Sequence, residues 1–138
     1  MSSERPYAQA LERLRCVDLR PTRQRLALAR LLFETPHRHV TAERLHEEAV
    51  AAGVQVSLAT VYNTLHQFTE AGMLREIVVD SGRSYFDTNT SEHHHFFHEN
   101  SSRLEDIPAG DVVVAEVPSP PDGTRISRVD VIVRLSGE

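Results

Sequence analysis

The chain has 138 residues, enough for one ordinary domain or two small ones that support each other. Its 40% hydrophobic and 25% charged residues are typical of a soluble globular protein, and its longest apolar runs are too short to span a membrane. The N-terminus lacks the apolar core of a signal peptide, and Cys16 is the single cysteine. We therefore expect a cytoplasmic protein with no internal disulfide and no multi-cysteine zinc site. Free cysteines are among the most often buried residues, so we expect Cys16 to be a buried, packed thiol.

The net charge of −5 hides a basic segment near the start of the chain. All 15 basic residues are arginine, and six of them lie between Arg13 and Arg30, where Asp18 is the single acid. Such a run is the electrostatic footprint of a phosphate-binding surface. A solvated helix face is the alternative, and the charge pattern alone does not separate the two.

Four helices are predicted in the first half of the chain. Thr22, Thr41 and Ser57 each precede an apolar-periodic segment and are good N-cap residues, and Gly53 and Gly72 follow two of the segments. The predicted helices cover residues 7–16, 22–33, 41–52 and 57–71.

The fourth predicted helix has one buried stripe and one face suited to DNA. Its apolar residues from Leu58 to Phe68 follow a helical period, which marks the buried side. The other side carries short, polar or planar side chains, of the kinds that hydrogen-bond bases or contact a thymine methyl in the major groove. These residues are Ala59, Thr60, Tyr62, Asn63 and Gln67, with Ser57 at the start. Two helices joined by a tight link, the second with this face, indicate a helix-turn-helix.

A β-hairpin is predicted next, with strands at 74–79 and 84–87 around a turn that contains Gly82. After a helix-turn-helix such a hairpin is a wing, and Arg83 at its tip can reach a phosphate. One of Tyr85 and Phe86 is expected in the core, because they alternate along a strand. Residues 1–87 are therefore predicted to form a winged-helix DNA-binding domain.

Residues 88–92 are polar and predict a hinge, and residues 93–138 are too few to fold alone. The β-branched runs at 112–114 and 129–133 predict strands, separated by a rigid Pro-rich turn at 118–123. Pairing with a second copy would stabilise so small a piece. The predicted fold class is α+β: an N-terminal winged helix-turn-helix followed by a small α/β dimerisation and effector-sensing domain, in a homodimer.

Four of the eight histidines fall within residues 93–98. In an extended chain His93 and His95 point to one side and His94 to the other. Two imidazoles on one face form half a site for a metal ion or a haem iron, and such a site on a DNA-binding module suggests a sensor. Exposed histidines without a ligand are the alternative. The residues that could complete the site are Asp87, His37 and His39.

The segments 20–25, 57–68, 85–89 and 93–95 resemble the ferric uptake regulator superfamily, and within it the iron response regulator branch of α-proteobacteria. The resemblance extends from about Leu11 to Leu135. It implies a dimeric winged-helix regulator that binds double-stranded promoter DNA of iron and haem homeostasis genes and loses its activity on binding haem.

The resemblance also implies roles for single residues. Tyr62 would contact bases, and Arg20, Arg23 and Arg25 would contact the DNA backbone. The positions that hold metal in many superfamily members are His39, Asp87 and His95.

The chain departs from the superfamily in two ways. It lacks the CxxC pairs that hold a structural zinc, so we expect no four-cysteine zinc site. Phe96 and Phe97 stand where the usual pattern continues with Asp and His, and an apolar wall beside the histidines favours haem over a hydrated ion. Haem is therefore the leading cofactor, with Fe, Mn or Zn as alternatives. His94 and His98 are further candidate ligands.

Two other functions would use the same histidines. A divalent-metal or peroxide-sensing repressor would use His39, Asp87, His93 and His95. A metal-dependent hydrolase would need three protein ligands, an open site and a nearby base, but no substrate cleft is indicated, so we expect no enzyme.

Overall fold

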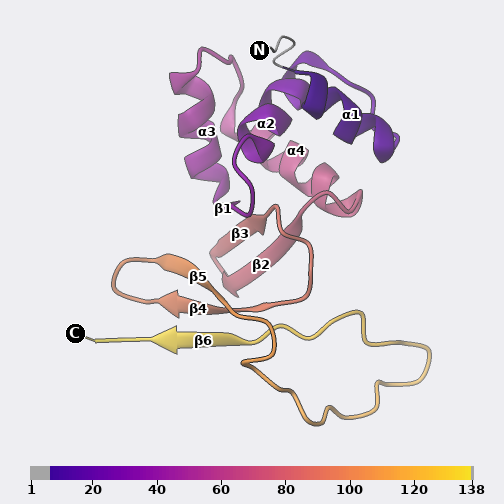
Figure 1. Ribbon diagram of the computed structural model, residues 1–138, viewed down its shortest axis with the longest axis vertical. Helices are drawn as coiled ribbons and strands as arrows, with labels where there is room; N and C mark the ends of the chain where they lie inside the picture. Colours follow the sequence, from indigo (N-terminus) through magenta and orange to yellow (C-terminus); the bar gives the residue numbers. More distant parts are fainter. Residues whose placement is uncertain (1–6, 138) are drawn as a thin grey trace. The chain divides into compact units, whose positions relative to one another are not determined.

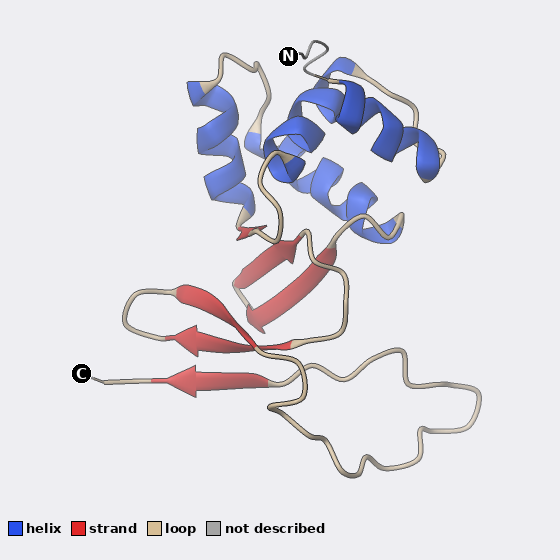
Figure 2. Ribbon diagram, viewed as in Figure 1, coloured by secondary structure: helices blue, strands red, loops and turns tan. Residues whose placement is uncertain are grey.

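The computed structural model describes residues 7–137, which form two compact units separated between Thr90 and Ser91. Each unit has its own sheet, and the helices belong to the first (Figures 1 and 2). No helix among these residues is long and apolar enough to cross a membrane. The mixed α+β fold class is confirmed.

The first unit contains four helices: α1 (Ala8–Cys16), α2 (Arg23–Phe33), α3 (Ala42–Ala51) and α4 (Leu58–Glu70). Thr22, Thr41 and Ser57 cap the last three helices, because each side-chain hydroxyl accepts the N–H of the residue three positions on. Each such cap contributes about 1 kcal/mol. The predicted helix starts are therefore confirmed, with the cap residues in the expected places.

A three-stranded antiparallel sheet follows the helices, with order β1-β3-β2. The strands are β1 (His39–Val40), β2 (Arg75–Asp80) and β3 (Arg83–Asp87). The β2–β3 hairpin is the predicted wing. The two-residue β1 was not predicted, because a strand so short leaves no alternation in the sequence. It pairs with β3, and in this pairing His39 lies opposite Asp87.

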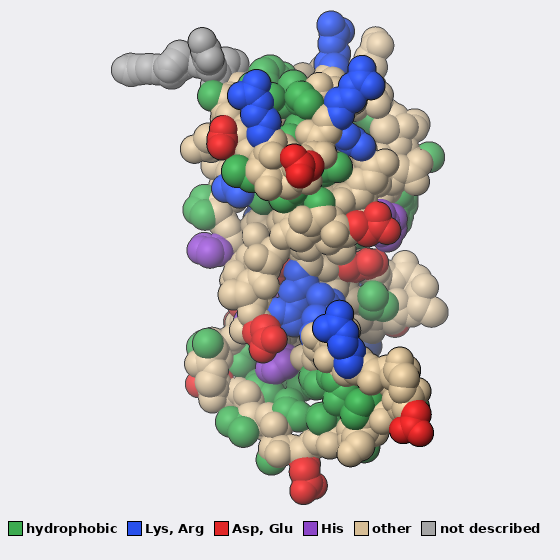
Figure 3. Space-filling view, turned by 90° about the vertical axis from the view of Figure 1, so that its right-hand side faces the viewer, with side chains coloured by type: hydrophobic (Ala, Val, Ile, Leu, Met, Phe, Trp, Pro, Cys, Tyr) green, Lys and Arg blue, Asp and Glu red, His purple; other side chains and the backbone are tan. Residues whose placement is uncertain are grey.

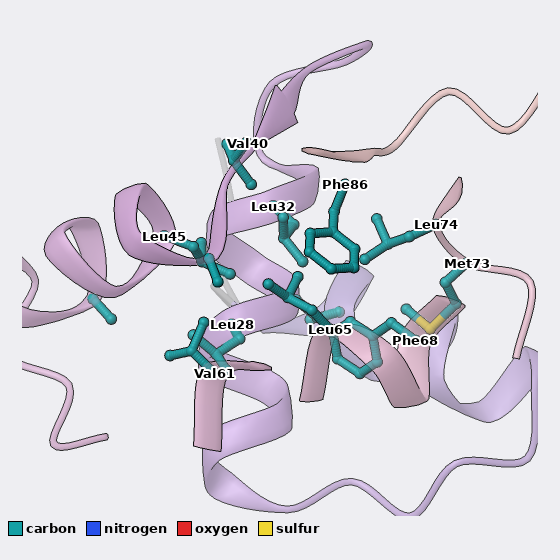
Figure 4. Close-up of a cluster of buried hydrophobic side chains, with 14 of the residues drawn as sticks. Leu28, Leu32, Val40, Leu45, Val61, Leu65, Phe68, Met73, Leu74 and Phe86 are labelled. Carbon is teal, nitrogen blue, oxygen red and sulfur yellow. The ribbon is translucent and has the colours of Figure 1, made fainter. Parts of the chain in front are cut away.

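The core of the first unit lies among its helices and includes Val40 and Phe86 of the sheet (Figure 4). Leu28, Leu32, Leu65 and Phe68 are fully buried there, and Phe86 of β3 packs into the same cluster. Tyr85 is also buried, so both of the alternating aromatics are enclosed.

The prediction of a buried Cys16 is wrong, because its side chain is exposed at the last residue of α1. The buried side of that helix is formed by Ala10 and Leu14, and the Cys16 thiol lies 3.6 Å from the Glu12 carboxylate.

The second unit contains β4 (His94–His98), β5 (Arg103–Ile107) and β6 (Ile132–Leu135), in the order β5-β4-β6. The central β4 pairs antiparallel with β5 and parallel with β6. The β4–β5 hairpin was not predicted. Its turn ends at Ser102, which has a φ of 56° and donates its N–H to the His98 carbonyl at 2.8 Å.

The predicted strand at 112–114 is wrong, since these residues are irregular and Val113 is 80% exposed. The strand expected at 129–133 begins only at Ile132. Strand propensity does not by itself provide a partner, and β4 is already paired along both edges. The segment between β5 and β6 leaves several apolar side chains exposed. Figure 3 shows apolar side chains (green) on the surface of the second unit.

Candidate DNA-binding face and metal centre

The face of α4 predicted to read DNA lies on the surface of the first unit. Ala59, Asn63 and Gln67 are exposed, as is the cap Ser57, and Thr60 is half-buried. Val61, Leu65 and Phe68 turn inward and are fully buried. The apolar stripe therefore fixes the rotation of α4 and leaves its polar side for a partner.

Tyr62 is half-buried at the edge of this face and is held by two neighbours. Its hydroxyl donates a hydrogen bond to Glu43 of α3 at 2.9 Å, and its ring stacks with His66 at a centroid distance of 6.4 Å. The hydrogen bond to Glu43, with smaller contributions from burial and from the charge of Glu43, raises the pKa of Tyr62 above 10.0. Tyr62 therefore remains a neutral phenol at physiological pH.

The arginines expected at the DNA backbone differ in their contacts. Arg20 and Arg23 are exposed. Arg25 donates from its guanidinium to Gln67 at 3.0 Å and to the Arg20 carbonyl at 2.9 Å, so it joins α2 to α4. Figure 3 shows arginine side chains (blue) on the surface of the first unit.

Arg83 is exposed at the wing turn, where its guanidinium lies 2.6 Å from the Asp80 carboxylate. The same carboxylate group accepts the Gly82 N–H at 3.1 Å, which shapes the turn. Because an exposed ion pair of this kind is worth at most about 1 kcal/mol, it does not prevent Arg83 from reaching a phosphate.

In the second unit, His93, His95 and Asp106 bring three ligand atoms together. The Nε2 atoms of His93 and His95 each lie 3.3 Å from the same oxygen, Oδ1 of Asp106. The strand pairing produces this convergence, because His95 of β4 lies directly opposite Asp106 of β5. Both histidines are buried, with 8% and 2% of their surface exposed, and their ring centroids are 4.5 Å apart.

The hydrogen bond of His93 sets which nitrogen faces Asp106. Its Nδ1 lies 2.7 Å from the Ser91 carbonyl, an acceptor only, so Nδ1 carries a proton. In the neutral ring Nε2 then presents a lone pair to the Asp106 carboxylate. Two electron-rich atoms at 3.3 Å repel unless a proton or a metal cation lies between them. A histidine held through its other nitrogen by a carbonyl is also the usual arrangement in metal sites.

The ligand separations fit a first-row divalent ion. Ligands about 2.1 Å from such an ion are about 3.0 Å apart in octahedral geometry and about 3.4 Å apart in tetrahedral geometry. The two 3.3 Å distances to Asp106 lie in that interval, and all three ligand atoms are within 4.8 Å of one another.

The other predicted ligands of the first unit are placed as follows. Asp87 ends β3, is fully buried and accepts the Asn89 N–H at 2.8 Å. His39 lies opposite Asp87 in the β1–β3 register and makes an edge contact with Tyr85 at 6.2 Å. His37 lies in the preceding loop with a φ of 54°. Their roles as ligands stay predictions.

His94 and His98 lie on the opposite face of β4 from His93 and His95. Nδ1 of His94 accepts the Val131 N–H at 3.0 Å, which ties the strand to the chain before β6. Nε2 of His98 lies 2.7 Å from the Glu105 carboxylate, and this hydrogen bond is the main reason why the pKa of Glu105 is lowered. The structure does not bring these two histidines to the His93–His95–Asp106 cluster.

The two phenylalanines are also divided between the faces of β4. Phe97 shares the face of His93 and His95 but is fully buried, with the Arg134 guanidinium 5.8 Å from its ring centroid. Phe96 points to the other side. They therefore do not form a joint apolar wall beside the two histidines.

A cavity of about 400 Å³ lies between α2 and α3 in the first unit, and one of about 190 Å³ touches His93 and His94 in the second. Pockets for drug-sized ligands hold about 300–1,000 Å³. The space beside His93 is therefore smaller than the pockets that hold drug-sized ligands, and a haem macrocycle is larger still.

Asp106 is the site residue that the sequence reasoning missed. The signal for it was the polar run 99–102 after the histidines, which is typical of a hairpin turn. Folding β4 back at that turn places Asp106 beside His95.

A winged-helix unit followed by a cluster of two buried histidines and Asp106 defines a DNA-binding protein with a candidate metal centre. The profile of the Ferric uptake regulator family matches residues 17–118. The peroxide-responsive repressor PerR of Staphylococcus aureus (strain Mu50) is 31% identical over 106 residues, which are 77% of this chain and 71% of that protein.

Solved structures agree on the fold. The ferric uptake regulator from Pseudomonas aeruginosa with manganese is 23% identical with a TM-score of 0.68, over 94% of this chain and 98% of that one. The Vibrio cholerae ferric uptake regulator is 19% identical with a TM-score of 0.69, over 91% and 98%. The chain therefore belongs to the ferric uptake regulator family. It is a metal-responsive transcription regulator and not an enzyme.

Proposed function

We propose that the chain is a homodimeric, cytoplasmic regulator that reads promoter DNA with α4 and the wing, under the control of a divalent metal ion held by His93, His95 and Asp106. The observation that carries the proposal is the convergence of both Nε2 atoms on one carboxylate oxygen at 3.3 Å. Dimerisation is supported by the small size of the second unit and by the two half-sites that a helix-turn-helix normally reads.

Two imidazoles and one carboxylate are donors that suit Fe²⁺, Mn²⁺ and Zn²⁺. Related structures point to the same ions: one contains manganese, one is a zinc-bound manganese uptake regulator, and one is a ferric uptake regulator from Francisella tularensis with iron. The bound ion would neutralise the electron-rich contact between Nε2 of His93 and Asp106. It would thereby hold β4 and β5 together, which couples metal binding to the order of the second unit.

Haem as the effector, with regulation of iron and haem homeostasis genes, is the proposal that the iron response regulator resemblance supports. The buried Phe97, the outward Phe96 and the small cavity beside His93 favour a metal ion over a macrocycle. We therefore place the divalent ion first and haem second.

The test is a mobility shift with the purified full-length chain at fixed salt, on a duplex that the protein selects from random DNA. Salt is fixed because phosphate contacts make DNA affinity steeply salt-dependent. A strong chelator should weaken binding, and Mn²⁺, Fe²⁺ or Zn²⁺ should restore it. His95→Ala should lose this response, whereas His98→Ala, which changes a histidine on the other face of the same strand, should keep it.

Haem is titrated in parallel. The haem proposal would replace the metal proposal if a chelator left DNA binding unchanged, haem binding gave a Soret band, and haem released the DNA. The similarity to PerR supports a third effector, peroxide. Loss of DNA binding when the iron-loaded protein is treated with hydrogen peroxide would support it.

A further inference from the structure

Glu43 lies in the first turn of α3, yet its carboxylate contacts a residue of α4. It accepts the Tyr62 hydroxyl at 2.9 Å. On its other side the Tyr62 ring stacks with His66 at an interplanar angle of 18°. His66 in turn meets the Phe86 ring edge-on at 5.5 Å. The Tyr62 side chain is therefore fixed at its hydroxyl by Glu43 of α3 and at its ring by His66 of α4, and Phe86 of β3 supports His66 in turn.

We infer that Glu43 is a positioning residue for sequence recognition. It holds Tyr62 in one orientation and accepts the hydrogen bond that the Tyr62 hydroxyl can donate. This inference rests on the proposed DNA-reading role of α4. A hydrogen bond to a carboxylate is stronger than one between neutral groups, so Tyr62 meets DNA already ordered.

The hydrogen bond also decides which bases Tyr62 selects. A free phenol both donates and accepts, but a phenol whose proton points to Glu43 can only accept. In the major groove the donors are the amino groups of adenine and cytosine, whereas guanine and thymine offer acceptors. At the position that the hydroxyl meets, the protein should therefore prefer adenine or cytosine.

Repulsion of DNA is a second role that has to be separated from the positioning of Tyr62, because a carboxylate near DNA repels phosphates. If repulsion were its whole effect, removing the charge would tighten binding to every sequence alike. The variants Glu43→Gln and Glu43→Ala separate the two roles. Glutamine removes the charge but keeps an oxygen that accepts the Tyr62 hydroxyl, and alanine removes both.

The experiment measures the affinity for two duplexes, one that the wild type selects from random DNA and one with a scrambled sequence. The readout is the ratio of the first affinity to the second. The full-length chain is used, loaded with Mn²⁺, at fixed salt. Glu43→Ala should lower the ratio about tenfold, the value of one base contact. Glu43→Gln should keep most of it. Glu47→Ala, which removes an exposed acid one turn along the same helix, should leave the ratio unchanged.

Two further readouts exclude a merely structural effect. In a Tyr62→Phe background, Glu43→Ala should lower the ratio no further, because the hydroxyl it positions is gone. In an absorbance titration, the tyrosine signal that Tyr62→Phe removes should appear at lower pH in Glu43→Ala than in the wild type. The reason is that Glu43 raises the pKa of Tyr62.

An unchanged ratio in Glu43→Ala, with tighter binding to both duplexes, would overturn the inference and leave the proposed function intact. If the wild type selected no sequence at all, the DNA-binding proposal would fail and this inference with it.

Discussion

Replacing Asp106 by Asn tests the metal centre at the atom on which it converges. The substitution keeps the volume of the side chain and removes the charge that faces Nε2 of both His93 and His95. An ion present at 100 times its dissociation constant stabilises the wild type by about 2.7 kcal/mol. Changing even an outer-shell partner of a ligand costs about 10–100-fold in metal affinity, so we take 100-fold as a conservative loss for Asp106 itself. At the same free metal concentration the stabilisation then falls to about 0.4 kcal/mol.

The assay is thermal unfolding of wild type and variant, each with a chelator and with Mn²⁺. For a chain of this size 1 kcal/mol corresponds to about 3–5 °C, so the metal-induced rise should shrink from about 8–14 °C to about 1–2 °C. Without metal the variant should be at least as stable as the wild type. The reason is that an amide N–H can donate to the Nε2 lone pair that the carboxylate repels.

Glu105→Gln is the matched control, because it removes the neighbouring carboxylate on the other face of β5. It should keep the metal-induced rise. If Mn²⁺ stabilised Asp106→Asn as much as the wild type, the ion would bind elsewhere and the cluster would have to be abandoned as the sensor site.

Two predictions concern the stability of the first unit. Burial alone would raise the pKa of Glu48, but its hydrogen bonds and ion pairs with Arg38 and Arg44 outweigh burial and lower it below 4.5. The stability contributed by Glu48 is therefore present above pH 4.5 and lost as the pH falls through the lowered value. Glu48→Gln should lower the free energy of unfolding by about 1 kcal/mol at neutral pH. In acid titrations the variant should lose less stability below pH 4.5 than the wild type does, and an equal loss would contradict this. Leu65→Ala, at a site with 0% exposure, should cost about 2–5 kcal/mol in urea unfolding, and a loss under 1 kcal/mol would mean that α4 is packed differently.

The sequence predicted the winged-helix unit closely because its signals are local. Thr22, Thr41 and Ser57 mark helix starts through bonds to residues only three positions away. The apolar stripe of α4 fixes which side of the helix is exposed. The single missed element, β1, exists because His39 and Val40 add to the edge of β3, a pairing across more than forty residues that no local pattern encodes.

The second unit was predicted less well because its order depends on pairing. The β-branched run at 112–114 has high strand propensity but remains irregular, whereas Arg103–Ile107, which carries three charges, forms β5. A strand needs a partner edge as well as a propensity. The short turn after His98 places β5 directly beside the edge of β4, whereas no such turn places the run at 112–114 beside a strand.

In the candidate site, too, the part set by local signals was predicted and the part set by strand pairing was not. The alternation of extended chain correctly put His93 and His95 on one face and His94 on the other, since side-chain direction in a strand is local. Asp106 enters only through the register of β4 with β5. A slip of one residue would turn Asp106 away and bring Glu105 opposite His95. The ligand set is therefore a property of the strand register, and Ser102, whose positive φ closes the turn, helps to select it.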